Sequence, residues 1–257
     1  MTNLIFDTHA HYNDESFDSD RESVLELLPS QNVCGVIDAG GDIKSSFNAV
    51  KLSEEYPYIY AAVGFHPEYL SDDIDVDNLI KELEKLICHD KVVAIGEIGL
   101  DYHFNSENKE IQKKVFEKQV EFAINHDLPV VVHDRDAHGD TLEILKKYKP
   151  RGVVHCFSGS LEMAKEIVKI GMLLGIGGVV TFKNAKNIVE VVKNIPLSSL
   201  VLETDAPYLS PVPFRGKRCV STYIEYTAQK IAEIKSITLQ EVLESTKSNA
   251  LKLFNIK

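Results

Sequence analysis

The stretch NLIFDTHAHYND, residues 3–14, joins a short apolar run to two histidines, His9 and His11, that lie one residue apart. Successive side chains of an extended strand alternate between faces, so both imidazoles point the same way and can converge on one object. A metal ion is one such object, and surface or turn chemistry is the alternative for an isolated pair. The choice depends on whether other strands end in the same way.

Seven further short apolar runs follow along the chain. Most are nearly continuous rather than alternating, which is typical of parallel strands that are covered by helices on one face and packed inside a barrel on the other. The predicted strands are residues 3–7, 33–39, 58–64, 92–97, 129–133, 152–156, 172–177 and 200–205.

Segments with helical periodicity separate these strands. In residues 108–126, apolar side chains mark one face and lysines and glutamates cover the other. Eight alternations without a Pro/Gly/Ser-rich linker predict an α/β fold, a (β/α)8 TIM barrel with an extra C-terminal helix, as a single domain over residues 1–257. The other predicted helices are residues 20–28, 44–55, 77–88, 139–147, 160–170, 184–194, 222–235 and about 238–254.

Composition limits the classes of function. The longest apolar run, residues 170–180, is too short and glycine-rich for a membrane span, and no signal peptide precedes the first strand, so we expect a cytoplasmic protein without membrane contact. The four cysteines are widely separated, which favours reduced thiols over a disulfide framework or a structural zinc site. With 28 basic and 39 acidic residues, the net charge of −11 disfavours a broad contact with duplex nucleic acid. Nothing indicates an obligate protein partner.

Residues of metal-ligand type occupy five of the predicted strand ends, and active sites of such barrels lie at that rim. Singly, a histidine there is commonly a hydrogen-bonded core residue and a glutamate can cap a helix. Together, four histidines and two carboxylates suit zinc, manganese, cobalt or magnesium. Six ligands exceed the need of one tetrahedral ion, so we predict two divalent ions. His9, His11 and Asp205 would hold the first ion, His133 and His155 the second, and Glu97 would bridge them.

Eight segments in order, FDTHAH, GFHP, GEIGLDYH, VVVHDRDA, HCFSGS, GVVTFKNA, ETDAPYL and FRGKR, resemble the TatD family of metal-dependent deoxyribonucleases, within the amidohydrolase-like barrels. The resemblance spans nearly the whole chain. It implies a divalent-metal hydrolase that cuts phosphodiesters of DNA, typically as an exonuclease from the 3′ end, on single strands or 3′ ends. The six predicted ligands stand at the family's ligand positions.

One segment departs from the family pattern. The family usually continues R-G-K-R with Asn-Glu-Pro, whereas this chain carries Cys219, Val220 and Ser221 in those places. Because this segment follows the last strand and borders the rim, the departure concerns substrate handling rather than the metal ligands.

For the chemistry, two cations would neutralise phosphate oxygens and activate a water. Asp205 is the predicted general base, with a role as ligand only as the alternative. Glu97 is counted with it as catalytic because it would bridge the ions. Glu203 shares the strand parity of Asp205 and is a candidate to support a ligating histidine.

Other rim residues are candidates for substrate binding. His66 could hydrogen-bond phosphate, with helix capping or packing as the alternative, and Arg135 could meet phosphate unless it pairs with a neighbouring aspartate. The loops after strands seven and eight, where barrels often hold phosphates, carry Lys183, Arg215, Lys217 and Arg218. Four aromatic residues of these and nearby loops could stack on an unpaired base, with core packing as the alternative: Tyr102, Phe104, Tyr208 and Phe214.

Two rival functions stay open. The same two ions would serve an amidohydrolase-type hydrolase of a small amide, lactone or phosphoester. A non-catalytic binding module on the same barrel would need a missing ligand or base, which the sequence does not show.

Overall fold

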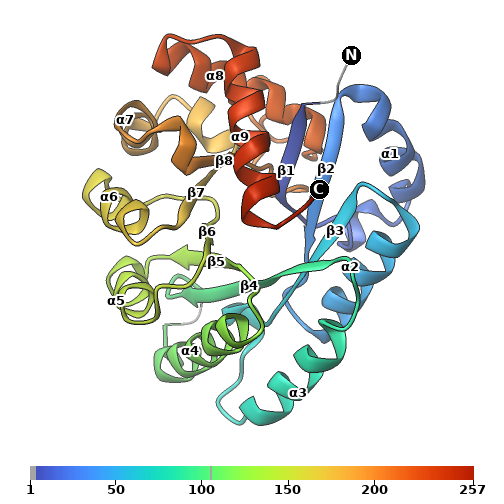
Figure 1. Ribbon diagram of the computed structural model, residues 1–257, viewed down its shortest axis with the longest axis vertical. Helices are drawn as coiled ribbons and strands as arrows, with labels where there is room; N and C mark the ends of the chain where they lie inside the picture. Colours follow the sequence, from blue (N-terminus) through green and yellow to red (C-terminus); the bar gives the residue numbers. More distant parts are fainter. Residues whose placement is uncertain (1–3, 105) are drawn as a thin grey trace.

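Eight parallel strands form one sheet in the order β1-β2-β3-β4-β5-β6-β7-β8, with helices around the outside (Figure 1). The computed structural model describes residues 4–104 and 106–257, so Asn3, at the start of the first predicted strand, lies outside the described residues. The strands are β1 (Ile5–Ala10), β2 (Val33–Ala39), β3 (Ile59–Val63), β4 (Val92–Asp101), β5 (Val130–Arg135), β6 (Gly152–Val154), β7 (Leu173–Ile176) and β8 (Leu200–Leu202).

Each strand is followed by a helix, and one more helix ends the chain, which confirms the predicted (β/α)8 barrel with its C-terminal addition. Across the described ranges, no helix combines the length and apolar composition needed to cross a bilayer. The helices are α1 (Arg21–Leu27), α2 (Ile43–Glu55), α3 (Val76–Leu86), α4 (Lys109–Asn125), α5 (His138–Tyr148), α6 (Leu161–Lys169), α7 (Lys186–Asn194), α8 (Ile224–Lys235) and α9 (Leu239–Leu253).

The barrel closes between its first strand and the segment that follows β8. The backbone N–H of Asp205 donates to the carbonyl of His9 at 2.9 Å, and the N–H of His11 donates to the carbonyl of Ala206 at 2.7 Å. An isolated parallel bridge joins Ala10 to Ala206. We call this junction of residues 9–11 with residues 205–206 the seam. It holds the end of the first strand beside the segment after the last strand, at the C-terminal rim of the barrel.

Strand β4 is longer than the sequence indicated. The expected end at Glu97 is wrong, because Ile98 to Asp101 continue to pair with β5, up to the partner pair Asp101 and Arg135. Gly99 makes this approach possible: its φ is +148°, and a Cβ there would lie 2.0 Å from the carbonyl oxygen of His133. Glu97 consequently lies inside the strand.

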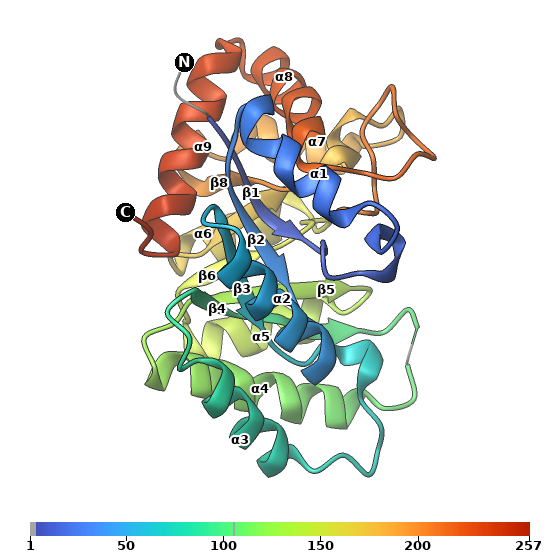
Figure 2. The same cartoon turned by 90° about the vertical axis from the view of Figure 1, so that its right-hand side faces the viewer.

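The inside of the barrel and the end where the strands begin form a separate apolar cluster. Buried side chains from every strand except β7 contribute to it, from Phe6 in β1 to Val201 in β8. Leu253 and Phe254 of the C-terminal segment pack against them. The side-chain amide of Asn249 donates to the carbonyl of Leu200, the first residue of β8, and to that of Leu197, three residues before it. Figure 2 shows α9 on the side where β1 begins, with the strands pointing away from it. The extra helix therefore plugs the N-terminal end of the barrel.

We expect Phe254→Ala to lower the free energy of unfolding by about 3 kcal/mol, because Phe254 is 3% exposed and its loss opens a cavity beneath the strands. Urea denaturation measures this. Phe47→Ala is the control, since Phe47 is 57% exposed on α2 and its removal should change stability by no more than about 0.5 kcal/mol. A loss below about 1 kcal/mol for Phe254→Ala would show that this side chain contributes little to closing the N-terminal end of the barrel.

Candidate metal centre

The rim of the barrel brings His9, His11 and Asp205 to one point. The two Nε2 atoms of the histidines lie 2.9 Å apart, and each lies 3.5 Å from Oδ1 of Asp205. His9 lies in β1 and His11 directly follows it, their side chains point the same way as the alternation along a strand predicts, and the seam holds Asp205 beside them. Three ligand-type atoms therefore face a common volume; we refer to it as the first site.

A second group of ligand-type atoms gathers on the other side of Glu97. Nδ1 of His133 and Nε2 of His155 lie 3.2 Å apart. They lie 2.9 Å and 2.7 Å from Oε1 of Glu97. These side chains come from β5 and from the residue that follows β6, so neighbouring strands deliver them; we refer to this group as the second site.

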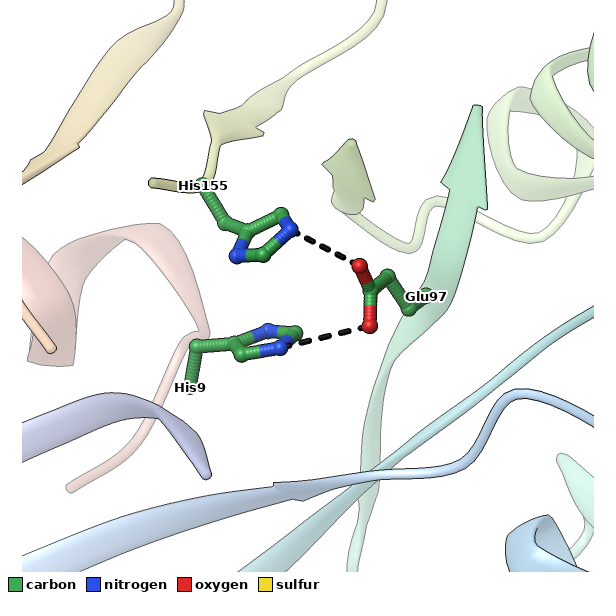
Figure 3. Close-up of side chains that lie close together, drawn as sticks. All are labelled: His9, Glu97 and His155. Carbon is green, nitrogen blue, oxygen red and sulfur yellow. Dashed lines mark ion pairs between the residues drawn. The ribbon is translucent and has the colours of Figure 1, made fainter. Parts of the chain in front are cut away.

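Glu97 stands between the two sites. Its Oε1 faces the second site, while its Oε2 lies 3.3 Å from Nε2 of His9 and 3.5 Å from Nε2 of His11. Figure 3 shows His155 and His9 approaching different oxygens of this carboxylate. One buried carboxylate thus offers one oxygen to each site, which is the arrangement of a bridging ligand.

Outer hydrogen bonds fix the orientation of two imidazoles. Nδ1 of His11 lies 2.9 Å from the carbonyl of Ala39, and Nε2 of His133 lies 3.0 Å from Oδ2 of Asp101. If these nitrogens carry the protons, the opposite nitrogens present lone pairs to the first and second sites. Asp101 was not among the residues selected from the sequence. It lies four residues after Glu97 in β4, so alternation along the strand places it on the same face as Glu97.

The charges of the site act on one another strongly. Burial opposes ionisation of Glu97, but the surrounding histidines hold its pKa well below the usual value. Burial lowers the pKa of His9 to about 4. Burial also lowers the pKa of His11 and of His133, but hydrogen bonds to the neighbouring carboxylates and the charges of these carboxylates outweigh it. The pKa of His11 is raised to about 10, and that of His133 to about 9.

The donor set fits divalent cations. The ligand atoms of His9, His11 and Asp205 lie within 4.8 Å of one another, and so do those of His9, Glu97 and His155. Imidazole nitrogen and carboxylate oxygen are ligands that zinc, manganese and cobalt accept. Among the described residues, Nδ1 of His9 and Nδ1 of His155 are buried without a hydrogen bond, whereas Nε2 of each ring lies beside Glu97.

Glu203 lies behind His155, as its strand parity predicts. Its Oε1 accepts a hydrogen bond from the backbone N–H of Cys156 and lies 3.8 Å from Nδ1 of His155. Burial raises the pKa of Glu203 to about 8. The carboxyl group therefore stands beside a ligand without entering either site.

His66 also faces the centre, but with a different role. Burial lowers its pKa to about 3, so the ring is neutral. Its Nδ1 accepts a hydrogen bond from the backbone N–H of Glu68, which leaves the proton on Nε2, 3.5 Å from Oε1 of Glu97. His66 therefore presents a hydrogen-bond donor rather than a lone pair.

The two sites open into a cleft of about 940 Å³ that Arg135 lines, together with His66, Tyr69 and Phe104. The guanidinium carbon of Arg135 lies 4.5 Å from the centre of the Phe104 ring. The neighbouring aspartates bind elsewhere: Asp134 contacts His138 and Asp136 contacts His103. Arg135 therefore lines the cleft two residues beyond the candidate ligand His133, while both neighbouring aspartates contact histidines.

The other four predicted cations lie away from this cleft. Arg218 binds Asp20 through both terminal nitrogens, at 2.8 and 2.6 Å. Arg215 stacks on Phe182, and Lys217 lies over Phe214. Lys183 is exposed on the loop after β7. The structure brings the six ligands, His66 and Arg135 together, and it places these four cations on the outer loops.

The aromatic candidates divide in the same way. Phe104 and Tyr208 line the cleft and are 61% and 54% exposed. Phe214 stacks on Tyr223 at 4.3 Å, and Tyr102 donates its hydroxyl to Asp140. Tyr69, which the sequence analysis did not select, is also exposed at the cleft.

The segment Cys219–Ser221 turns inward behind the rim. Cys219 and Ser221 are fully buried, and the hydroxyl of Ser221 donates to Asp7 at 2.6 Å. The departure from the family pattern therefore lies in the packing beneath the first site rather than on the cleft surface.

Comparisons with known proteins agree with this geometry. The sequence profile of a family described as TatD related DNase matches residues 6–255. The uncharacterized metal-dependent hydrolase YabD of Bacillus subtilis is 45% identical, over 98% of this chain and 100% of that protein. The crystal structure of YjjV, a TatD homolog from Escherichia coli, superposes with a TM-score of 0.93 at 31% identity and 100% coverage of both chains. The uncharacterized metal-dependent hydrolase YcfH of Escherichia coli is 32% identical, over 98% of this chain and 96% of that protein.

We expect Glu97→Ala to remove both ions and abolish activity while the fold persists, because the variant loses the shared ligand at the rim and leaves the barrel core intact. Elemental analysis of the purified protein and circular dichroism measure these effects. Glu68→Ala, which changes an exposed carboxylate of the same cleft, is the control and should keep its metal. Normal metal content in Glu97→Ala would contradict the bridging role.

We expect metal binding at pH 7 to release at least two protons per chain, because His11 and His133, with pKa values raised to about 10 and about 9, are protonated without an ion and must be neutral to ligate one. Although burial opposes it, the neighbouring carboxylate of Glu97 raises the pKa of His155 as well, so this ligand adds to the release. The apparent affinity should therefore rise with pH through the neutral range. Calorimetric titration in buffers of different ionisation enthalpy counts the protons. A heat that is independent of the buffer would show that these histidines are already neutral.

Proposed function

The chain belongs to the family of TatD-related DNases and is a metal-dependent hydrolase, and from this premise we propose that it cleaves phosphodiester bonds of DNA with two divalent ions. The ions would be Mg²⁺, Mn²⁺, Zn²⁺ or Co²⁺. We propose further that it works from 3′ ends of single-stranded DNA, as the resemblance to the family implies.

The observation that carries the proposal is the position of Glu97. Its two oxygens face different sets of histidines, with Oε1 2.7 Å from His155 and Oε2 3.3 Å from His9. When bound, two ions on either side of it would neutralise phosphate oxygens and lower the pKa of a water molecule. A phosphodiester needs both effects, because its negative charge repels hydroxide.

The protein's own groups supply the proton and hydrogen-bond chemistry. Asp205 is the proposed general base, because it lies at the first site and its pKa, which burial raises but the neighbouring histidines lower further, stays below the usual value, so the carboxylate is ionised. It would take a proton from the attacking water as the water oxygen bonds to phosphorus and the bond between phosphorus and the leaving oxygen breaks, and it would then pass that proton to the leaving oxygen. The Nε2–H of His66 would donate to a phosphate oxygen, and Arg135 would pair with the same phosphate.

The outer cations would act farther along the strand. Lys183, Arg215 and Lys217 are exposed on loops after β7 and β8, where they would meet phosphates of a longer substrate. Arg218 would contribute only if its pair with Asp20 opened. Phe104 and Tyr208 are placed to stack on bases beside the scissile bond.

The charge of the cleft supports a second candidate, a hydrolase of a small phosphoester, amide or lactone. Carboxylates that line the cleft beyond the metal centre outnumber the lysines and arginines there, which opposes a long polyanion. These carboxylates are Asp14, Glu15, Asp18, Asp42, Glu55 and Glu68, and the cations are Arg21, Lys44, Lys51 and Arg135.

The decisive assay incubates the protein with oligonucleotides labelled at the 3′ or the 5′ end, with Mg²⁺, Mn²⁺, Co²⁺ or Zn²⁺ added in turn. We expect mononucleotides to be released from the 3′ end of single strands. Glu97→Ala, prepared identically, excludes a contaminating nuclease. Failure to release nucleotides with every metal, together with cleavage of a small ester or amide, would favour the second candidate.

Arg135→Ala should lower kcat/KM by roughly 100-fold on both a dinucleotide and a long oligonucleotide, because it removes a charged contact to the reacting phosphate, at about 1.5–3 kcal/mol. Arg215→Ala should affect only the long substrate, and mainly at low salt. Steady-state kinetics on the two substrates separate these roles. An equal loss in both variants would place the outer loop at the reacting phosphate.

A further inference from the structure

Asp7 lies fully buried beneath the first site, and its carboxylate accepts four hydrogen bonds. Oδ1 accepts from the backbone N–H of His9 at 3.3 Å and of Thr204 at 3.0 Å. Oδ2 accepts from the hydroxyls of Thr204 and Ser221, each at 2.6 Å. One carboxylate thus ties β1 to the segment after β8, on both sides of the seam that carries the ligands His9 and Asp205.

Ser221 extends this connection to the residue that follows His11. Its backbone N–H donates to the Tyr12 hydroxyl at 2.9 Å, and the two hydroxyl oxygens lie 2.9 Å apart. Because the Ser221 hydroxyl proton points to Asp7, the Tyr12 hydroxyl donates to Ser221. The backbone N–H of Tyr12 in turn donates to Asp38 of β2 at 2.6 Å. We call Asp7, Tyr12, Asp38, Thr204 and Ser221 the Asp7 network.

The Asp7 network surrounds the chain segments of only one site. His9 and His11 lie between two of its members, Asp7 and Tyr12, and Asp205 directly follows a third, Thr204. The second site takes its histidines from β5 and the end of β6, on the other side of Glu97. A change in the network should therefore displace the ligands of the first site and leave those of the second in place.

We propose that Ser221 is a positioning residue for the first ion, acting through Asp7 and Tyr12. The inference rests on the two-ion arrangement proposed above. Within residues 4–104 and 106–257, the hydrogen bonds of the Ser221 side chain go to Asp7 and Tyr12 and not to a ligand side chain. The Ser221 hydroxyl donates to Oδ2 of Asp7 and accepts from Tyr12, and in this way it would set the distance between the pair His9 and His11 and the ligand Asp205. This chain carries the serine where the resembling family usually has proline, which has no backbone N–H and no hydroxyl to offer.

The test titrates Mn²⁺ into the metal-free full-length protein by calorimetry at constant pH, with His11→Ala and His133→Ala identifying the first and second sites. Ser221→Ala should weaken the first ion roughly tenfold, the lower end of the range for groups that orient metal ligands, and leave the second within about twofold. Ser221→Thr keeps the hydroxyl and should restore the affinity. Ser53→Ala removes another fully buried hydroxyl, which bonds to Val50 within α2, and should change neither site.

Unchanged affinity of the first ion in Ser221→Ala, or an equal loss at both sites, overturns the proposal. If Ser221→Ala does not fold, Tyr12→Phe removes the other hydroxyl and keeps the ring that packs on Phe17 at 4.8 Å. It must show the same selective loss, and unchanged affinity there also overturns the proposal.

A wild-type protein that binds one ion would contradict the two-ion arrangement separately. If that single ion is lost in His11→Ala, it occupies the first site, and Ser221→Ala should still weaken it. If the ion is retained in His11→Ala and lost only in His133→Ala, it occupies the second site, and the proposal for Ser221 is overturned. The readout needs no nucleic acid, so failure of the DNase assignment does not affect it.

Discussion

The carboxylate of Glu97, buried among five histidines, is the interaction on which the rest of the molecule depends. An ionised carboxylate inside a protein is costly unless opposite charge or hydrogen-bond donors surround it. His9, His11, His66, His133 and His155 all approach it to within 3.5 Å. The surrounding histidines offset this cost and hold the pKa of Glu97 well below its usual value. This compensation of charges allows so polar a group of side chains to lie at the mouth of an apolar barrel.

The apolar packing that stabilises the barrel and the polar side chains of the metal centre lie at opposite ends of the strands. The N-terminal end of the barrel is closed by the C-terminal segment, with Leu253 and Phe254 packed against the inner side chains of the strands. Its C-terminal end carries the candidate ligands, three within strands and three in the first one to three residues after a strand. Strands position side chains more precisely than loops do, which favours a site that needs a fixed geometry. In TIM barrels generally, the active site lies at the C-terminal face, and residues at the N-terminal face serve stability.

The two sites are held by different means. Neighbouring strands β4, β5 and β6 position the second site, with Asp101 orienting His133. The first site lies on the seam, where β8 is short and ordinary strand pairing with β1 is reduced to a bridge. Buried side chains add to the backbone hydrogen bonds there, with Asp7 accepting hydrogen bonds from the backbone on both sides. Side-chain hydrogen bonds thus reinforce the few backbone hydrogen bonds at the point where the barrel closes.

The sequence by itself determined the alternation of strands and helices, the barrel and the six ligand-type residues, because apolar runs and their polar ends are local patterns that follow strand geometry. It did not reveal that β4 continues to Asp101, since that extension depends on pairing with β5 at Gly99. It also did not distinguish Arg135 from Arg218, both of which follow a predicted strand end. Only the tertiary structure shows that one lines the cleft while the other is paired with Asp20. Nor did the sequence show that Ser221 reaches Asp7, across more than two hundred residues, because contacts between remote segments arise only when the barrel closes.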